Sequence, residues 1–346
     1  MNEKTVFVVG AGASADFGLP LGRKLKTDIA NELRAAQRAQ HDQEHNRLRA
    51  ALNQLPLQPL DLAIERIIAA MPSAESIDNF VHQHRNDKDI ECVAKMAIVH
   101  CILQAERDST LCEPDPIPGQ PTASPINLYR EGNEDSWLNT LFMAVTKGAA
   151  VHELAEVLIN LTLIVFNYDR CVEHFLHTVF MSHYNLTPAE AAGLVDLITI
   201  IHPYGMIGPL PWMVAADETY LAFGANTPLK SAAERAQGIR TFTENIKKDT
   251  RQREMIAQAM ADAQRIAFLG FAYHRLNLDA LKPAKKSTVP VEGDRMIFGT
   301  AFDLSAFRRG EIHDELYGRF SVDRSHIHLM SEKDTSSALI KDYFLR

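Results

Sequence analysis

Four short polar motifs in the 346-residue sequence each follow an apolar stretch that predicts a β-strand. They are GAGAS (Gly10–Ser14), NYD (Asn167–Asp169), HPYG (His202–Gly205) and GFAYH (Gly270–His274). A glycine turn before a helix can present backbone N–H groups to a phosphate, and a histidine can exchange protons with a substrate near neutral pH. Because parallel strands end at the same edge of a sheet, we expect the four motifs to meet there.

Each motif alone also has a structural interpretation. Asn167 and Asp169 are residue types that cap the helix expected after them. His202 could be a hydrogen-bonded histidine at a strand end, and Gly270 could be an ordinary turn. A shared site explains the position of all four motifs after strands better than chance does.

The first motif also matches a dinucleotide-binding pattern. Gly10, Gly12 and Ala15 fit G-x-G-x-x-G/A, a short and common match. In a dehydrogenase, an acidic residue about 20 positions further on ends a second strand and holds the ribose. Asp28 and Glu32 lie near that distance but inside a predicted helix, which disfavours a dehydrogenase.

The elements that must position these motifs follow an α/β pattern. Strands are predicted at Val6–Val9, Leu161–Phe166, Leu197–Ile201, Arg265–Leu269, Met296–Phe298 and His326–Leu329. Helical stretches alternate with them, ending with a helix from about Thr335. We therefore expect a Rossmann-like, mostly parallel sheet with helices on both faces.

A helical insertion is expected within this domain. Residues 1–40 and 151–346 are assigned to the sheet domain, and residues 41–150 to the insertion. Its helices are expected to break at Pro56 and Pro59. Glu113–Pro125 contains five prolines and a glycine and predicts an exposed loop.

Composition excludes several classes of protein. The formal net charge of −8 argues against direct nucleic-acid binding, and Lys282, Lys285 and Lys286 are interpreted as a solvated loop. No apolar run of about 18 residues and no signal-peptide pattern occurs, so we expect a cytoplasmic protein with no membrane partner.

The cysteines predict neither zinc nor a disulfide framework. Cys92, Cys101, Cys112 and Cys171 contain no C-x-x-C pair and are expected to be buried thiols.

In this order and spacing, the four motifs resemble the sirtuin superfamily over about residues 5–280. GAGASADFGLPLGR, which ends at Arg23, resembles the nucleotide loop of that family. NYD stands where the family has Asn-x-Asp, and HPYG stands where it has the catalytic histidine, usually written His-Gly. GFAYH resembles the glycine loop that meets the adenosine side of NAD.

The departures from the family pattern concern its zinc module and its acyl-lysine wall. The chain lacks the two C-x-x-C pairs of the deacylases, and Pro203 and Tyr204 separate the histidine from its glycine. In place of the zinc module lies the helical insertion, with a SIDNF stretch similar to those of sirtuin-like NAD-consuming proteins in bacterial antiphage defence. That resemblance implies hydrolysis of NAD to nicotinamide and ADP-ribose, without a metal.

The resemblance also implies roles for individual residues. Asn167 would position the ribose and a water, Asp169 would orient this apparatus or supply negative charge, and His202 would accept a proton. The residues implied to hold NAD are Gly10, Ala11, Gly12, Ala13, Ser14, Arg23, Gly270 and Phe271. His274 could line the pocket or lie outside it, and Tyr168 is expected to serve packing.

The resemblance implies an NAD-depleting effector that assembles as a homo-oligomer and is controlled by a partner such as a HerA-like ATPase or an Argonaute-like protein. FRRGEIHDEL, near the C-terminal end, could be a partner surface. The alternatives are a non-catalytic sensor of NAD or ADP-ribose and, with less support, an NAD-dependent deacylase. The histidine pairs His82/His84 and His174/His177 have helical spacing, but no Glu or Cys set completes a metal site.

Overall fold

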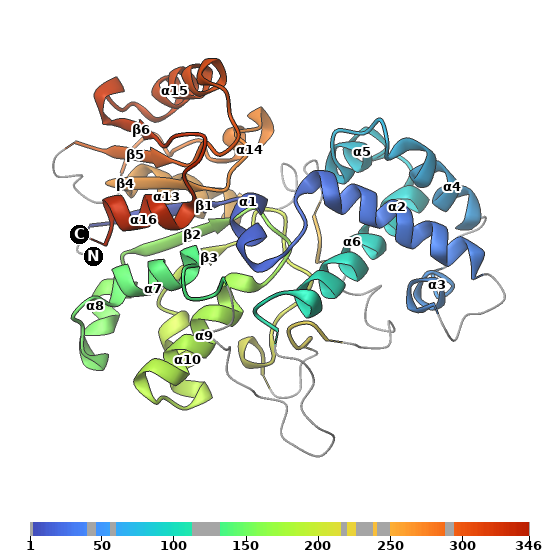
Figure 1. The fold of residues 1–346 in the computed structure, drawn as a ribbon, viewed down its shortest axis with the longest axis horizontal. Coiled ribbons are helices and arrows are strands. Elements are labelled where there is room, and N and C mark those ends of the chain that lie inside the picture. The colour runs from blue at the N-terminus through green and yellow to red at the C-terminus, as the bar shows by residue number, and fades with distance from the viewer. Residues whose placement is uncertain are drawn as a thin grey trace.

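The computed structural model describes residues 3–39, 46–55, 60–112, 132–215, 220–225, 238–240, 250–287 and 294–345. Its centre is a six-stranded parallel sheet (Figure 1). The strands are β1 (Thr5–Val9), β2 (Leu161–Val165), β3 (Thr199–Ile201), β4 (Arg265–Leu269), β5 (Met296–Gly299) and β6 (Ile327–Leu329). Their order is β3-β2-β1-β4-β5-β6, that of doubly wound nucleotide-binding folds. The predicted α/β fold class is confirmed, although β3 begins two residues later than expected.

The strand register brings the polar motifs to one level. Val9 at the end of β1 pairs with Val165 of β2 on one side and with Leu269 of β4 on the other. Ile201 of β3 pairs with Ile164, one residue before the end of β2. The residues that follow these four strands therefore leave the sheet at the same edge.

Alternate strand residues pack against helices on the two faces. On β1, Val6 and Val8 belong to one core, and Phe7 and Val9 belong to the other. The first face carries α13 (Thr250–Asp262), α14 (Arg275–Ala280) and α15 (Ala306–Phe320). The second carries α7 (Trp137–Thr146), α8 (Leu154–Leu158), α9 (Cys171–Tyr184), α10 (Pro188–Val195) and α16 (Ser336–Tyr343).

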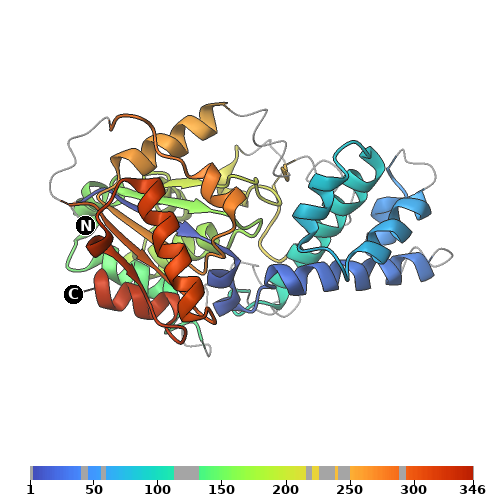
Figure 2. The same ribbon diagram turned by 90° about the horizontal axis from the view of Figure 1, so that it is seen from above.

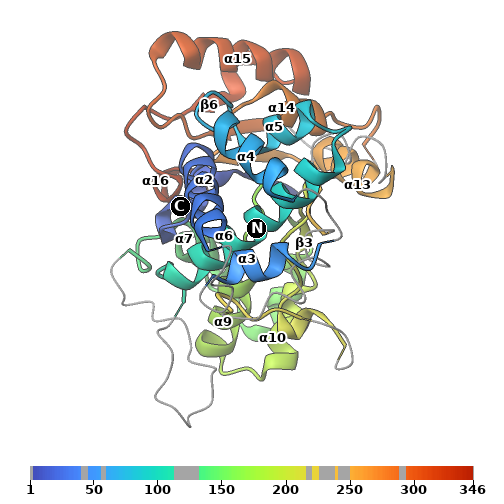
Figure 3. The same cartoon turned by 90° about the vertical axis from the view of Figure 1, so that its right-hand side faces the viewer.

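Five helices form a lobe beside the sheet domain (Figure 2), and this lobe faces the viewer in Figure 3. They are α2 (Gly22–Arg38), α3 (Arg47–Leu52), α4 (Leu60–Ala70), α5 (Ile77–Gln83) and α6 (Lys88–Asp108). The limits of this lobe differ from those expected for the insertion. Helix α2 packs on α6 and α4, because Leu25, Ile29 and Leu33 form its apolar stripe, whereas α7 packs on α16 and α9 of the sheet domain.

The short elements are α1 (Ala11–Ser14), η1 (Ala15–Phe17), η2 (Val151–Glu153), η3 (Pro211–Met213) and η5 (Arg324–His326). Pro56, Pro59 and the loop predicted at 113–125 lie outside the described residues. No helix in the described ranges is both long and apolar enough to cross a membrane.

The sequence predicts exposure of three lysines and burial of the four cysteines. Lys282, Lys285 and Lys286 are exposed, as predicted for a solvated loop. Of the four cysteines, Cys101 and Cys171 are buried, but the prediction is wrong for the other two: Cys92 and Cys112 are only half-buried.

Candidate functional site

The centre of the site lies at the carboxyl ends of the neighbouring strands β1 and β4, between which the strand order reverses. The Gly10 N–H donates to the Leu269 carbonyl and the Gly12 N–H to the Gly270 carbonyl, both at 2.9 Å. A Cβ on Gly270, whose φ is +54°, would lie 2.0 Å from the Ala13 nitrogen. The glycines thus allow two backbone turns to touch at the position where doubly wound sheets bind dinucleotides.

The GAGAS turn is held by a hydrogen bond from Trp137, and two of its residues are accessible to solvent. The Trp137 indole N–H donates to the Ala13 carbonyl at 2.9 Å, and Ala13 and Ser14 are buried. Ala11 and Gly12 keep some accessible surface. Arg23 is exposed in the first turn of α2, and its guanidinium has no hydrogen bond or ion pair with another described residue.

Asn167 connects the second motif to the first. Its side-chain Nδ2 donates to the Gly10 carbonyl at 3.1 Å and to the Ser14 hydroxyl at 2.8 Å, so the helix-capping interpretation of this residue is wrong. Its Oδ1 is buried and has no hydrogen-bond partner among the described residues. An unpaired buried acceptor is unfavourable unless a donor completes it, and a ribose hydroxyl or a water is such a donor.

His202 contacts the backbone of Asn167 and is only 5% exposed. Its Nδ1 is 2.9 Å from the Asn167 carbonyl oxygen, and its Nε2 is 2.7 Å from Oε1 of Glu173 on α9. Burial alone would lower the pKa of His202. The charge and hydrogen bond of Glu173, with the Asn167 carbonyl, outweigh burial and raise the pKa.

Sequence reasoning missed Glu173. A signal was present, because Glu173, Leu176 and Phe180 recur at helical spacing on the buried face of α9, and only the first is charged. A carboxylate at such a position needs a buried partner.

Asp169 serves the start of α9. Its Oδ1 accepts a hydrogen bond at 3.2 Å from the N–H of Cys171, the first residue of α9, although the N-cap position of that helix is Arg170. Burial raises the pKa of Asp169, although hydrogen bonds from Cys171 and Ser14 lower it in part.

The fourth motif contributes a glycine and an aromatic core. The Gly270 N–H donates to Oγ1 of Thr300 at 2.9 Å, and Thr300 was not expected from the sequence. The Phe271 ring is buried and packs against Phe166, Phe268 and Tyr273. The Phe271 side chain therefore belongs to the core.

The SIDNF segment brings the helical lobe to this edge of the sheet. The Tyr168 hydroxyl donates to Oδ1 of Asp78 on α5. Glu75, just before α5, lies 3.5 Å from the exposed ring of His274. Tyr168 is thus buried and also links the NYD motif to the lobe.

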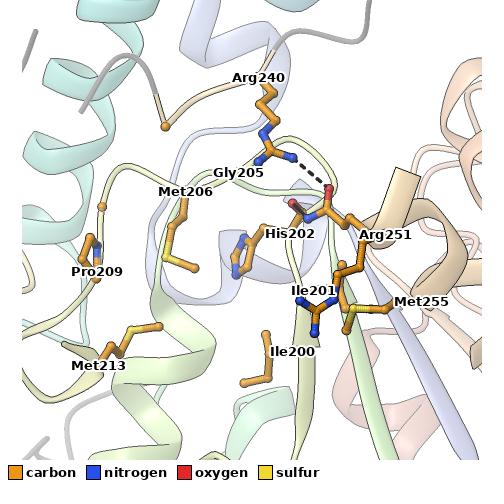
Figure 4. Close-up of a pocket in the computed structure, with 13 residues that line it drawn as sticks. Ile200, Ile201, His202, Gly205, Met206, Pro209, Met213, Arg240, Arg251 and Met255 are labelled. Atoms are coloured by element: carbon orange, nitrogen blue, oxygen red, sulfur yellow. Dashed lines mark hydrogen bonds between the residues drawn. The ribbon is translucent and has the colours of Figure 1, made fainter. Parts of the chain in front are cut away.

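A cavity of about 510 Å³ lies beside His202 at the β3 edge (Figure 4). Its lining residues are Ile200, Ile201, His202, Gly205, Met206, Gly208, Pro209, Met213, Gly238, Arg240, Arg251, Gln252 and Met255. The Gln252 side chain donates to the His202 carbonyl at 2.8 Å and accepts from Arg240 at 3.3 Å. No residue of the Gly10–Ser14 turn or of the GFAYH motif lines this cavity.

A buried ion pair follows the NYD motif and was also missed. Arg170 and Glu106, the latter on α6, are both fully buried. The Arg170 guanidinium makes two hydrogen bonds to the carboxylate and three to the carbonyls of Gly208, Leu221 and Ala222. The carboxylate also accepts from the N–H groups of Arg170 and Gly224. This pair connects α6 and the start of α9 to the backbone of Gly208 and of residues 221–224.

The remaining histidines do not form a metal centre in the described part of the chain. No group of three or more His, Cys, Asp or Glu residues is placed to hold an ion there. The rings of His174 and His177 stack on Phe223 and Trp212. Burial lowers the pKa of His174 to about 3, which keeps that ring neutral.

The sequence was compared with protein-family models and with curated proteins, and neither comparison returned a match.

Proposed function

We propose that the chain is an NAD hydrolase that releases nicotinamide and ADP-ribose. One observation carries the proposal. At the carboxyl ends of β1 and β4, Asn167 binds the Gly10–Ser14 turn through its side chain and His202 through its backbone carbonyl. This arrangement joins a dinucleotide-type turn to a hydrogen-bonding amide and an acid–base group.

The substrate would lie over the two glycine turns, after β1 and after β4, where their backbones touch. Ala11 and Gly12 keep accessible surface in the turn after β1, where the pyrophosphate would lie, and the exposed guanidinium of Arg23, which has no partner among the described residues, is suited to pair with its charge. Gly270 would approach the adenosine half through its backbone.

Cleavage requires no protein nucleophile, because nicotinamide is a cationic leaving group in NAD. The C1′–N bond breaks, its electron pair goes to nicotinamide, and the ribose becomes oxocarbenium-like. Water then attacks C1′ and gives up one proton. The Oδ1 of Asn167, which has no partner among the described residues, would orient a ribose hydroxyl or the water, and His202 would accept the proton.

A second candidate is a sensor that binds NAD or ADP-ribose without cleaving it. The observation that favours it is that both ring nitrogens of His202 already have partners.

The resemblance further supports a cytoplasmic, NAD-depleting role in antiphage defence under the control of a partner protein. Helix α15, which contains FRRGEIHDEL, exposes Phe307 by 77% and Tyr317 by 44%, so it offers apolar surface to such a partner. Recovery of no companion when the protein is isolated from its native host would count against this part of the proposal.

The test is to incubate the protein with NAD and to quantify nicotinamide and ADP-ribose. Asn167→Ala and His202→Ala are the site variants, and His152→Ala, at an exposed position, is the matched control. We expect His202→Ala to lower the rate by about 10²–10⁴-fold, the usual contribution of acid–base catalysis.

The outcomes separate the two candidates. Cleavage that persists in both site variants would contradict the assigned residues. A wild type that binds NAD in calorimetry but does not cleave it would favour the sensor. Absence of both binding and cleavage would contradict the proposed function.

A further inference from the structure

The hydrogen-bond partners of His202 determine where its ring protons lie. The Asn167 carbonyl oxygen only accepts, so Nδ1, 2.9 Å away, carries a hydrogen. Nε2 is 2.7 Å from Oε1 of Glu173, and a contact this short needs a proton between the two atoms. The pair is therefore either an imidazolium with a carboxylate or a neutral ring with a carboxylic acid. In both forms, neither ring nitrogen is open to a substrate.

Of the two carboxylate oxygens of Glu173, Oε1 is hydrogen-bonded to His202, and Oε2 has no partner among the described residues. The Glu173 side chain is 2% exposed, and Oε2 is buried. A carboxylate in this position stabilises the bound orientation of the ring, because the hydrogen bond is charge-assisted and shielded from water. The other charged groups near the ring are Asp169, before α9, and Arg240 and Arg251, which line the adjoining cavity.

The surroundings of His202 give the ring room to leave this partner. The ring stands near Met206 and Ile200 at the wall of the 510 Å³ cavity (Figure 4). Methionine side chains adapt readily to a change in a neighbour. Rotation of the ring away from Glu173 would therefore move it along a cavity wall instead of into a packed core.

We propose that Glu173 is a positioning residue that withholds His202 from the substrate until the Nε2–Oε1 hydrogen bond is broken. When the two side chains part, the shared proton stays on Glu173, and the neutral ring has a free Nε2. That nitrogen can then accept a proton from a ribose hydroxyl or from the attacking water. This inference rests on the proposed NAD hydrolysis.

The test compares Glu173→Gln with wild type and with Glu156→Gln, the same change at an exposed position of α8. The amide introduced by Glu173→Gln would keep the packing but form only a neutral hydrogen bond. We expect the basal rate of NAD cleavage to rise about ten-fold, since charge-assisted hydrogen bonds are roughly twice as strong as neutral ones. The pH at which cleavage rises should fall, because the ring loses its negative neighbour. Glu156→Gln should change neither quantity.

A second measurement does not depend on activity. The ¹⁵N chemical shifts of the His202 ring, assigned with His202→Asn, should show in wild type an Nε2 that is protonated or strongly hydrogen-bonded across neutral pH. In Glu173→Gln the ring should lose that proton at a lower pH. A wild-type Nε2 with the chemical shift of a free ring nitrogen, neither protonated nor hydrogen-bonded, would overturn the proposal even if the variant does not fold.

The two readouts separate this proposal from the proposed function. A folded Glu173→Gln that cleaves NAD more slowly, or with an unchanged pH profile, would overturn the role of Glu173 while leaving NAD hydrolysis in place. If the ring is released in the variant but no protein cleaves NAD, the proposed function fails, while the restraint of the His202 ring by Glu173 stands.

Discussion

Two buried polar networks adjoin the NYD motif and differ in how completely their atoms are paired. The closed network is Arg170 with Glu106. The Arg170 guanidinium donates five hydrogen bonds, and both carboxylate oxygens of Glu106 accept hydrogen bonds. The open network is Asn167, His202 and Glu173, in which Asn167 Oδ1 and Glu173 Oε2 have no partner among the described residues.

The difference indicates which network serves the fold and which serves chemistry. A buried group whose donors and acceptors are all paired has no capacity left for a ligand, and its removal leaves its partners unpaired. Unpaired buried acceptors lower stability, so a native structure retains them where another requirement outweighs that loss. We therefore assign the closed network to holding the backbone of Gly208 and of residues 221–224, and the open network to the site.

The largest effect is expected from breaking the closed network. Arg170→Met leaves the Glu106 carboxylate buried without a counter-charge and should lower the free energy of unfolding by about 3–5 kcal/mol. Urea unfolding followed by circular dichroism measures this change. The double variant Arg170→Met/Glu106→Leu should recover much of the loss, because no charge remains buried. A single variant as stable as wild type would contradict the structural assignment.

A smaller effect is expected in the open network at comparable burial. Asn167→Ala removes two hydrogen bonds but also removes the unpaired Oδ1, so the two contributions partly cancel. The free energy of unfolding should fall by about 1 kcal/mol, while NAD cleavage is lost. A loss of stability as large as that in Arg170→Met would show that the two networks do not differ in role.

The His202–Glu173 pair should appear as a pH dependence of stability. The pKa of His202 is raised in the folded protein, so the pair stabilises the fold fully below the unfolded pKa of histidine, about 6.5, and this stabilisation is lost as pH rises through the folded pKa. The advantage of wild type over Glu173→Gln should therefore shrink as pH increases above neutrality.

Unfolding midpoints of the two proteins across pH 5–9, approximately the range in which histidine titrates, test this expectation. Burial lowers the pKa values of His174 and His177, which gives them the opposite pH dependence. That contribution is common to both proteins and cancels in the difference. A difference that stays constant across the range would argue against an ionised pair.

The fold could be predicted because its signals are local. Runs such as Leu161–Phe166 are rich in β-branched and aromatic residues, and helices alternate with them, which implies parallel strands. Parallel strands then bring Gly10, Asn167 and His202 to one edge without any knowledge of their contacts.

The pairing within the site could not be predicted, because it depends on contacts distant in sequence. Glu106 and Arg170 are 64 residues apart, and Asn167 reaches Gly10 across 157. Glu106 and Glu173 each lie among mostly apolar buried positions of a helix, so the pattern indicates burial but does not identify their partners. The limits of the lobe were likewise set by the packing of α2 on α6.

The smallest effect is expected where the open network meets the helical lobe. Tyr168, next to Asn167, donates its hydroxyl to Asp78, whose pKa is raised by burial and lowered in part by this hydrogen bond. Tyr168→Phe keeps the ring in the core and removes the hydrogen bond to Asp78, so the unfolding free energy should fall by about 0.5–1 kcal/mol. If the lobe is positioned through this contact, hydrogen exchange should accelerate in α5 and not in β1 or β2. An equal increase in the strands would show that Tyr168 supports the core alone, and the open network would then have no connection to the lobe through this side chain.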